Sequence, residues 1–243
     1  MSRLKSAEFV ASVLDLQPRL AVFDCDGTLW AGDAGEGFFD WELKRGLLSD
    51  ETVRWARARY ADYKGRRVEE DTMCGEMVTM HRGLAEKEVQ RAADRFFEEH
   101  FRTQFFPEMR SLVDQLRASG CDVWAVSSSN EWIIRAGMKH CGIAEDRILA
   151  STALIEKGRV TSQLVRVPCG PGKPAAIDEV IGRRPDAAFG NSRWDTEMLA
   201  MAVHAFAVNP NPDLKATAQE RGWNIYYPAS IPTAPSDGSP PRQ

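Results

Sequence analysis

An apolar segment that stops at two carboxylates constrains this chain more than any other feature of its sequence. Residues 20–23 read Leu-Ala-Val-Phe, Asp24 and Asp26 follow, and Gly27 and Thr28 then break the run. A short apolar run bounded by turn residues is typical of a buried parallel strand. Ligands of open α/β sheets bind beyond the carboxyl ends of such strands. Taken alone, the segment allows either a magnesium and phosphate site or an aspartate pair that only solvates a strand end.

The region that follows has a different character. Between residues 33 and 106 the pattern predicts helices without strands, at 36–45, 50–64, 68–82 and 86–101. A βαβ repeat would alternate helices with strands, so this region is predicted to be an all-helical cap domain inserted into a larger α/β domain.

From Pro107 onward, helices and strands alternate. We expect strands at 122–126, 147–151, 187–189, 205–208 and 223–227 and a hairpin over 151–166. Helices are expected at 108–118, at 131–140, from about 172 to 181 and beyond Asp195, and a leading helix at 5–16. The predicted fold class is therefore α/β, a doubly wound, Rossmann-like parallel sheet formed by residues 1–32 and 107–228. Residues 229–243 are rich in Pro, Ser and Gly and are expected to form a disordered tail.

Composition narrows the class of partner. A net charge of −4 does not favour nucleic-acid binding, and no apolar run approaches the ~18 residues of a membrane span. The five cysteines are scattered and form no C-x-x-C pair, as expected of reduced thiols in a cytoplasmic protein. The sequence leaves the oligomeric state open.

Polar residues follow several of the expected strands. Asp24 and Asp26 are joined in chain order by Ser127, by Lys173 before its helix, and by the segment 191–195, which contains Asn191 and Asp195. In a doubly wound sheet these positions converge on one edge. Carboxylates, a lysine and a hydroxyl at such an edge suit phosphoryl transfer, because a carboxylate attacks phosphorus and the cations neutralise the developing charge.

These motifs resemble those of the haloacid dehalogenase superfamily, and within it the phosphoserine phosphatase-like branch with a helical C1-type cap. The D-x-D-G-T motif stands at residues 24–28, the strand-closing serine at Ser127, and the helix-opening lysine at Lys173. The fourth motif, G-D-x-x-x-D in the family, corresponds to residues 190–195. The resemblance covers residues 20–30 and 107–228.

The resemblance implies a role for each matching residue. Asp24 is the expected nucleophile and a magnesium ligand, and Asp26 the general acid and base whose carbonyl contacts the metal. Lys173 is expected to pair with the nucleophile and the phosphate. Ser127 is expected to bind phosphate, and Asp195 to complete the Mg²⁺ site.

Neighbouring positions complete the expected site. Gly27, Thr28 and Ser128 are expected to bind the substrate beside Ser127. Asn191 departs from the family, which often has an aspartate ligand there, and whether Asn191 or Asp195 contacts the metal directly is left open.

The second aspartate of the first motif favours a phosphatase. Hydrolysis of a phosphate monoester requires a proton for the leaving alkoxide, whereas halide displacement does not, and Asp26 is present to supply it. We therefore expect a Mg²⁺-dependent phosphomonoesterase that acts on a small phosphorylated metabolite, with phosphoserine and phosphocholine as examples. The alternatives are a catalytically weak phosphate-ester-binding protein, suggested by Asn191, and a phosphotransferase.

Specificity is expected to lie in the cap. Glu36 stands where phosphoserine phosphatases have a glutamate that faces the substrate amine. Arg66 or Arg67 could meet a substrate carboxylate, but a basic pair in a loop is more often simply exposed. An aromatic set has two interpretations, as a pocket for a quaternary amine or as the packing core of the cap itself; it consists of Trp41, Trp55, Tyr60 and Tyr63.

Overall fold

The computed structural model describes residues 5–229, and its sheet confirms the expected fold class. The strand order is β4-β3-β2-β1-β5-β6-β7, and all neighbours pair in parallel except β3 and β4. The strands are β1 (Leu20–Phe23), β2 (Asp122–Asn130), β3 (Ile148–Glu156), β4 (Arg159–Arg166), β5 (Ala187–Gly190), β6 (His204–Val208) and β7 (Asn224–Tyr226). The predicted tail lies, from residue 230 onward, outside the described residues.

Helices cover both faces of this sheet. They are α1 (Ser6–Leu14), α6 (Pro107–Ala118) and α7 (Glu131–Lys139) on one face, and α8 (Gly172–Val180), α9 (Thr196–Met201) and α10 (Pro212–Arg221) on the other. Strand β1 shows why: Ala21 and Phe23 pack with the first set, whereas Leu20 and Val22 pack with the second. Side chains alternate across a strand, so an all-apolar strand needs cover on both faces.

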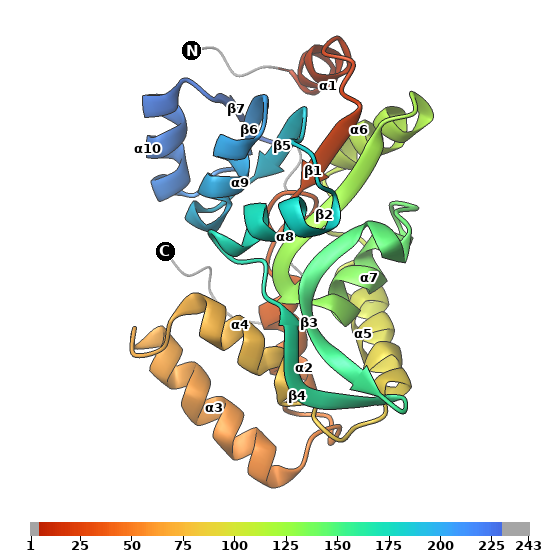
Figure 1. Ribbon diagram of the computed structural model, residues 1–243, viewed down its shortest axis with the longest axis vertical. Helices are drawn as coiled ribbons and strands as arrows, with labels where there is room; N and C mark the ends of the chain where they lie inside the picture. The colour runs from red at the N-terminus through yellow and green to blue at the C-terminus, as the bar shows by residue number, and fades with distance from the viewer. Residues whose placement is uncertain (1–4, 230–243) are drawn as a thin grey trace.

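Four helices separate β1 from α6, as predicted. They are α2 (Ala34–Glu42), α3 (Asp50–Lys64), α4 (Glu70–Thr79) and α5 (Glu86–His100). Figure 1 shows α3 at the lower left, away from the sheet, and α4 between α3 and the β3–β4 hairpin, with α5 on the other side of that hairpin. Helix α3 buries only Ala56, so it is the least embedded of the four.

Backbone hydrogen bonds tie the hairpin to the loop between α4 and α5. Gly83 N donates to Val160 O at 2.8 Å, Val160 N to Leu84 O at 3.0 Å, and Glu86 N to Gly158 O at 2.9 Å. Phe97 of α5 also belongs to the hydrophobic cluster that contains Phe23. Helix α5 and the loop that precedes it are therefore packed and hydrogen-bonded onto the α/β layers.

Some elements differ from the sequence prediction. Strand β2 runs to Asn130, beyond its predicted end at residue 126, and still pairs in parallel with β3 there. The predicted hairpin over 151–166 is confirmed, because β3 continues to Glu156 and pairs antiparallel with β4 from Arg159. Helix α10 was not predicted; it buries only Leu214 and Ala218, too few apolar residues for a periodic signal. In the part of the chain that the structure describes, no helix is long and apolar enough to cross a membrane.

Candidate active site

Asp24 directly follows β1, where the chain turns out of the sheet. Its backbone N–H still donates to Phe189 O of β5 at 2.9 Å, which fixes the residue at the carboxyl edge of the sheet. The Thr28 hydroxyl donates to Asp24 Oδ2 at 2.8 Å, and the turn between them needs Gly27 at φ +74°. This left-handed conformation is disfavoured for other residues. The D-x-D-G-T sequence thus orients its own first carboxylate.

Lys173 contacts residues of three segments that are far apart in the sequence. It lies in the first turn of α8 with only 1% of its surface exposed. Its Nζ donates to Asp24 Oδ1 at 2.8 Å, to Asp195 Oδ1 at 2.5 Å and to Val126 O at 2.9 Å. A buried ammonium requires such compensation, and three acceptors match its three N–H groups.

The charges of this cluster are unequal. Two buried carboxylates face one ammonium, and burial together with the charge of Asp195 raises the pKa of Asp24 to about 6 despite Lys173. Burial opposes the charge of Lys173, but Asp195 and Asp24 outweigh it and raise the pKa of the lysine above its ordinary value. The cluster therefore holds an excess of negative charge that a further cation would neutralise.

Asp195 is held by the loop that follows β5. Its Oδ2 accepts from Asn191 N at 3.0 Å, Ser192 N at 2.9 Å and Ser192 Oγ at 3.2 Å. A Cβ at Gly190 would lie 2.5 Å from Asp195 Cβ, so only glycine lets this loop fold back. The fourth motif thus positions its aspartate through its own backbone.

Asp26 points into a different environment. Its Oδ1 accepts from Trp30 Nε1 at 2.8 Å and from Ala34 N at 2.6 Å, and its Oδ2 from Ser129 Oγ at 2.7 Å. Burial and the nearby Asp33 raise the pKa of Asp26 to about 8, against the effect of these hydrogen bonds. A carboxyl with this pKa is protonated near neutrality, as a general acid must be.

Ser129 is a partner that the sequence interpretation missed. Ser127 and Ser128 were the predicted serines, yet Ser127 Oγ accepts from Ser129 N at 3.2 Å, and Ser128 O accepts from Ser151 Oγ at 2.6 Å. The run of three serines was the available signal. The shift in strand register between Val126 and Asn130 decides which of them meets Asp26.

Asn191 lies against Gly27. Its side-chain nitrogen is 1.8 Å from the position of a Cβ built on Gly27, so the two loops approach each other with no room for a side chain. Asn191 O also accepts from Asn211 N at 2.8 Å, at the start of α10. The structure thus places Asn191, the residue of the fourth motif that differs from the family pattern, against the first motif.

The donor set suits a hard cation such as Mg²⁺. Carboxylate and amide oxygens are its preferred protein ligands, and the excess negative charge at Asp24 and Asp195 favours it. Within residues 5–229 no group of three or more His, Cys, Asp or Glu side chains forms a metal cluster. Such an ion would therefore also need amide, backbone or solvent oxygens, as Mg²⁺ commonly does.

A cavity of about 70 Å³ adjoins these residues. We call it the α2–α4 cavity; its lining includes Asp33 and Glu36 at the start of α2, Tyr60, Tyr63 and Lys64 of α3, Glu70 of α4 and residues 128–130 of β2. Glu36, Tyr60 and Tyr63 thus line one cavity.

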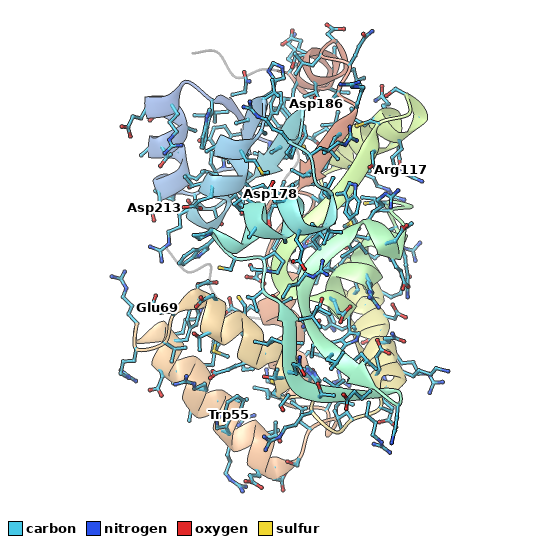
Figure 2. The ribbon with its side chains drawn as sticks, viewed as in Figure 1. Trp55, Glu69, Arg117, Asp178, Asp186 and Asp213 are labelled. Atoms are coloured by element: carbon cyan, nitrogen blue, oxygen red, sulfur yellow. The ribbon has the colours of Figure 1, made fainter. Side chains whose placement is uncertain are left out.

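The other specificity candidates lie elsewhere. Trp41 packs on Phe38, with ring centroids 6.1 Å apart, and Arg67 pairs with Asp62 at 2.7 Å. Trp55 is 42% exposed, and Figure 2 shows it on α3 at the foot of the molecule. The aromatic set is therefore divided: Trp41 packs inside the helical region, whereas the two tyrosines face a cavity.

The chain is similar in sequence to a family of known proteins. A family model described as haloacid dehalogenase-like hydrolase matches residues 21–200. A Neisseria meningitidis protein named histidinol-phosphatase is 25% identical, over 85% of this chain and 97% of its own. A Mycobacterium tuberculosis protein named phosphoserine phosphatase is 24% identical, over 90% of this chain and 75% of its own.

Solved structures share the fold. A Bordetella pertussis protein described as having unknown function superimposes with a TM-score of 0.76 at 20% identity, over 86% of this chain and 97% of its own. The family model spans most of the chain, from β1 through α8 and β5 to α9. The protein therefore belongs to the haloacid dehalogenase-like hydrolase family.

Proposed function

We propose that the protein is a Mg²⁺-dependent phosphomonoesterase that acts through an aspartyl-phosphate on a small phosphorylated metabolite. The observation that carries this proposal is the position of Lys173, whose ammonium joins Asp24 to Asp195 at the sheet edge while Asp26 is held apart from them. Family membership and the phosphatase names of two relatives support it.

In the first step an Asp24 carboxylate oxygen attacks phosphorus, and the bond from phosphorus to the leaving oxygen breaks. Asp26 donates its proton to that oxygen, which its raised pKa makes available. Lys173 limits the charge that builds up beside Asp24.

In the second step Asp26, now a carboxylate, takes a proton from water, whose oxygen attacks the aspartyl-phosphate. The Asp24–phosphorus bond breaks, inorganic phosphate leaves, and both carboxyl groups return to their starting forms. Ser129, Trp30 and Ala34 N hold Asp26 in one position throughout, since all three donate to it.

The phosphate and metal need their own ligands. In this proposal Gly27, Thr28, Ser127 and Ser128 surround the phosphate. Asp24, the Asp26 carbonyl, Asn191 and Asp195 would hold a magnesium ion, which would supply positive charge to stabilise the transferred phosphoryl group.

The leaving group is proposed to enter the α2–α4 cavity. This proposal divides the chain into two domains, an α/β domain of residues 1–32 and 107–228 and a helical cap of residues 33–106. Glu36 of the cap would contact the substrate. The names of the two relatives favour an amine-bearing alcohol ester. All five cysteines are unpaired, which suits the cytoplasm.

Hydrolysis of p-nitrophenyl phosphate tests the proposal. We expect phosphate release that requires Mg²⁺, stops with EDTA and is lost in Asp24→Asn. An acid-quenched reaction should carry a phosphoryl group on the peptide that contains Asp24. Activity that survives EDTA or Asp24→Asn would refute the proposal, ester binding without turnover would favour the binding-protein alternative, and transfer to added alcohols would indicate a phosphotransferase.

A further inference from the structure

The α2–α4 cavity begins beside the proposed general acid. Ser129 lines it and also donates to Asp26 at 2.7 Å, so a group that takes the Asp26 proton projects toward this cavity. The cavity is small, at about 70 Å³, and most of its other walls come from helices α2 to α4. A leaving group of a few heavy atoms fits this space.

Two tyrosines form one wall, and carboxylates fix both of them. Tyr60 Oη donates to Glu36 Oε1, and Tyr63 Oη donates to Glu70 Oε2. Burial and these carboxylates raise the pKa of each phenol, so both remain protonated donors. The two rings lie 5.7 Å apart at 40° and present adjacent π surfaces.

An ammonium group already lies over these rings. Lys64 Nζ is 4.9 Å from the Tyr60 ring centroid and 5.7 Å from that of Tyr63, and 3.3 Å from Glu36 Oε1. These are cation–π distances, and the Lys64 side chain remains 50% exposed. The wall therefore accommodates a cation, and the cation that it holds is on a flexible chain that can move into solvent.

The residues that line the cavity carry a net negative charge. Three carboxylates line the cavity, those of Asp33, Glu36 and Glu70, against the single ammonium of Lys64. That ammonium is already paired with Glu36. A carboxylate on a substrate would enter a region of net negative charge, whereas an ammonium would be attracted.

We propose that the α2–α4 cavity is the subsite for a leaving group that carries an alkylammonium and no carboxylate, and that Lys64 occupies the cation position until substrate displaces it. This inference rests on the proposed phosphatase function. It separates amino-alcohol phosphates such as phosphoethanolamine and phosphocholine from phosphoserine, whose leaving group bears both charges.

The first experiment compares three matched esters. Phosphoethanolamine, phosphoserine and n-propyl phosphate share a short chain and differ in the ammonium and the carboxylate. We expect kcat/KM for phosphoethanolamine to exceed that of both others by about tenfold, which corresponds to ~1.4 kcal/mol. Equal values, or a preference for phosphoserine, would overturn the subsite.

Binding to the Asp24→Asn variant separates this inference from the proposed function. Titration calorimetry needs no turnover, so it reports the subsite even if the protein hydrolyses nothing. Tighter binding of phosphoethanolamine than of phosphoserine and n-propyl phosphate supports the subsite. Failure of p-nitrophenyl phosphate hydrolysis alone would count against the phosphatase proposal, and loss of the binding preference alone against the subsite.

Variants test Lys64 and Glu70 directly. Lys64→Met removes the competing ammonium and the one partner for a substrate carboxylate, so the ratio of kcat/KM for phosphoethanolamine to that for phosphoserine should rise by about tenfold. A ratio does not depend on the fraction of folded enzyme. Glu70→Gln should lower the same ratio, and an unchanged or opposite response in both variants would contradict the inference.

Glu69 provides the matched control for Glu70. It is the preceding residue, exposed and with no side-chain capping bond, and Figure 2 shows it at the outer edge of the molecule, where α3 joins α4. Glu69→Gln removes the same charge outside the cavity. We expect it to leave the substrate ratio unchanged, and a loss equal to that of Glu70→Gln would show that long-range charge, and not the cavity, sets the preference.

Discussion

Replacing Lys173 by methionine isolates the charge that joins the motifs. Methionine fills nearly the same volume, so the substitution removes the ammonium without opening a large cavity. Asp24 and Asp195 are then left as two buried carboxylates with no cation between them, and Val126 O loses its donor.

The expected loss follows from the burial of this ammonium. Removing one partner of a buried ion pair costs about 3–5 kcal/mol, because the remaining charge stays buried and uncompensated. Lys173 is 1% exposed and serves two carboxylates, so solvent does not screen the loss. The free energy of unfolding of a domain is typically about 5–15 kcal/mol, so a loss of this size is large enough to measure.

The deficit should depend on pH. The folded-state pKa of Asp24 is raised to about 6 from 3.8, so the stability associated with its bound proton is present at low pH and is lost as pH rises through about 6. Without Lys173 this pKa moves higher still. The variant should therefore lose most stability near pH 8 and recover part of it at pH 5, where Asp24 is protonated.

Urea unfolding at pH 5 and pH 8, in EDTA and followed by tryptophan fluorescence, measures both effects. Lys139→Met is the matched control, because Lys139 forms an exposed pair with Asp94 at 2.6 Å and its removal should cost less than about 1 kcal/mol. Equal losses in the two variants, or a Lys173→Met deficit that does not change with pH, would refute the electrostatic interpretation.

Three further predictions concern the same edge of the sheet. Asp26→Asn should lower kcat for alkyl phosphates by about 10²–10³-fold and for p-nitrophenyl phosphate by less, since nitrophenolate needs no proton. In the native enzyme, kcat for alkyl esters should fall above about pH 8, because Asp26 then loses the proton that it donates. Gly27→Ala should lower the free energy of unfolding by about 1–2 kcal/mol in urea titrations, because φ is +74° and the new Cβ meets Asn191. Asn191→Asp should lower the Mg²⁺ concentration for half-maximal activity by roughly tenfold, because added ligand charge tightens metal binding; an unchanged requirement would place Asn191 outside the metal site.

Local patterns were enough to predict much of this architecture. Strand β1 and the loop after β5 form from residues adjacent in sequence, since Thr28 orients Asp24 and Ser192 orients Asp195 within a few positions. Helices α2 and α3 likewise begin at local side-chain caps, Asp33 and Ser49.

Contacts between distant segments could not be predicted in the same way. The Ser129–Asp26 bond joins residues 103 positions apart and depends on a shift of strand register, which no periodicity encodes. Trp55 and Tyr60 are five residues apart, so helical spacing puts them about 140° apart around α3. Which of these two faces meets the cavity depends on how α3 packs against α4, and spacing does not predict that. The sequence therefore indicates which residues are chemically able to act, whereas tertiary packing decides which of them meet.

Helix α3 buries few of its side chains, and this has a consequence for the evolution of specificity. Only Ala56 of this helix is buried, yet the helix supplies Tyr60, Tyr63 and Lys64 to the cavity. Substitutions there cost little folding energy, while the strand ends that hold Asp24, Lys173 and Asp195 tolerate almost none. Descendants of one ancestral hydrolase can thus exchange substrates by drift in a single exposed helix, and relatives that share every strand-end motif need not share a substrate.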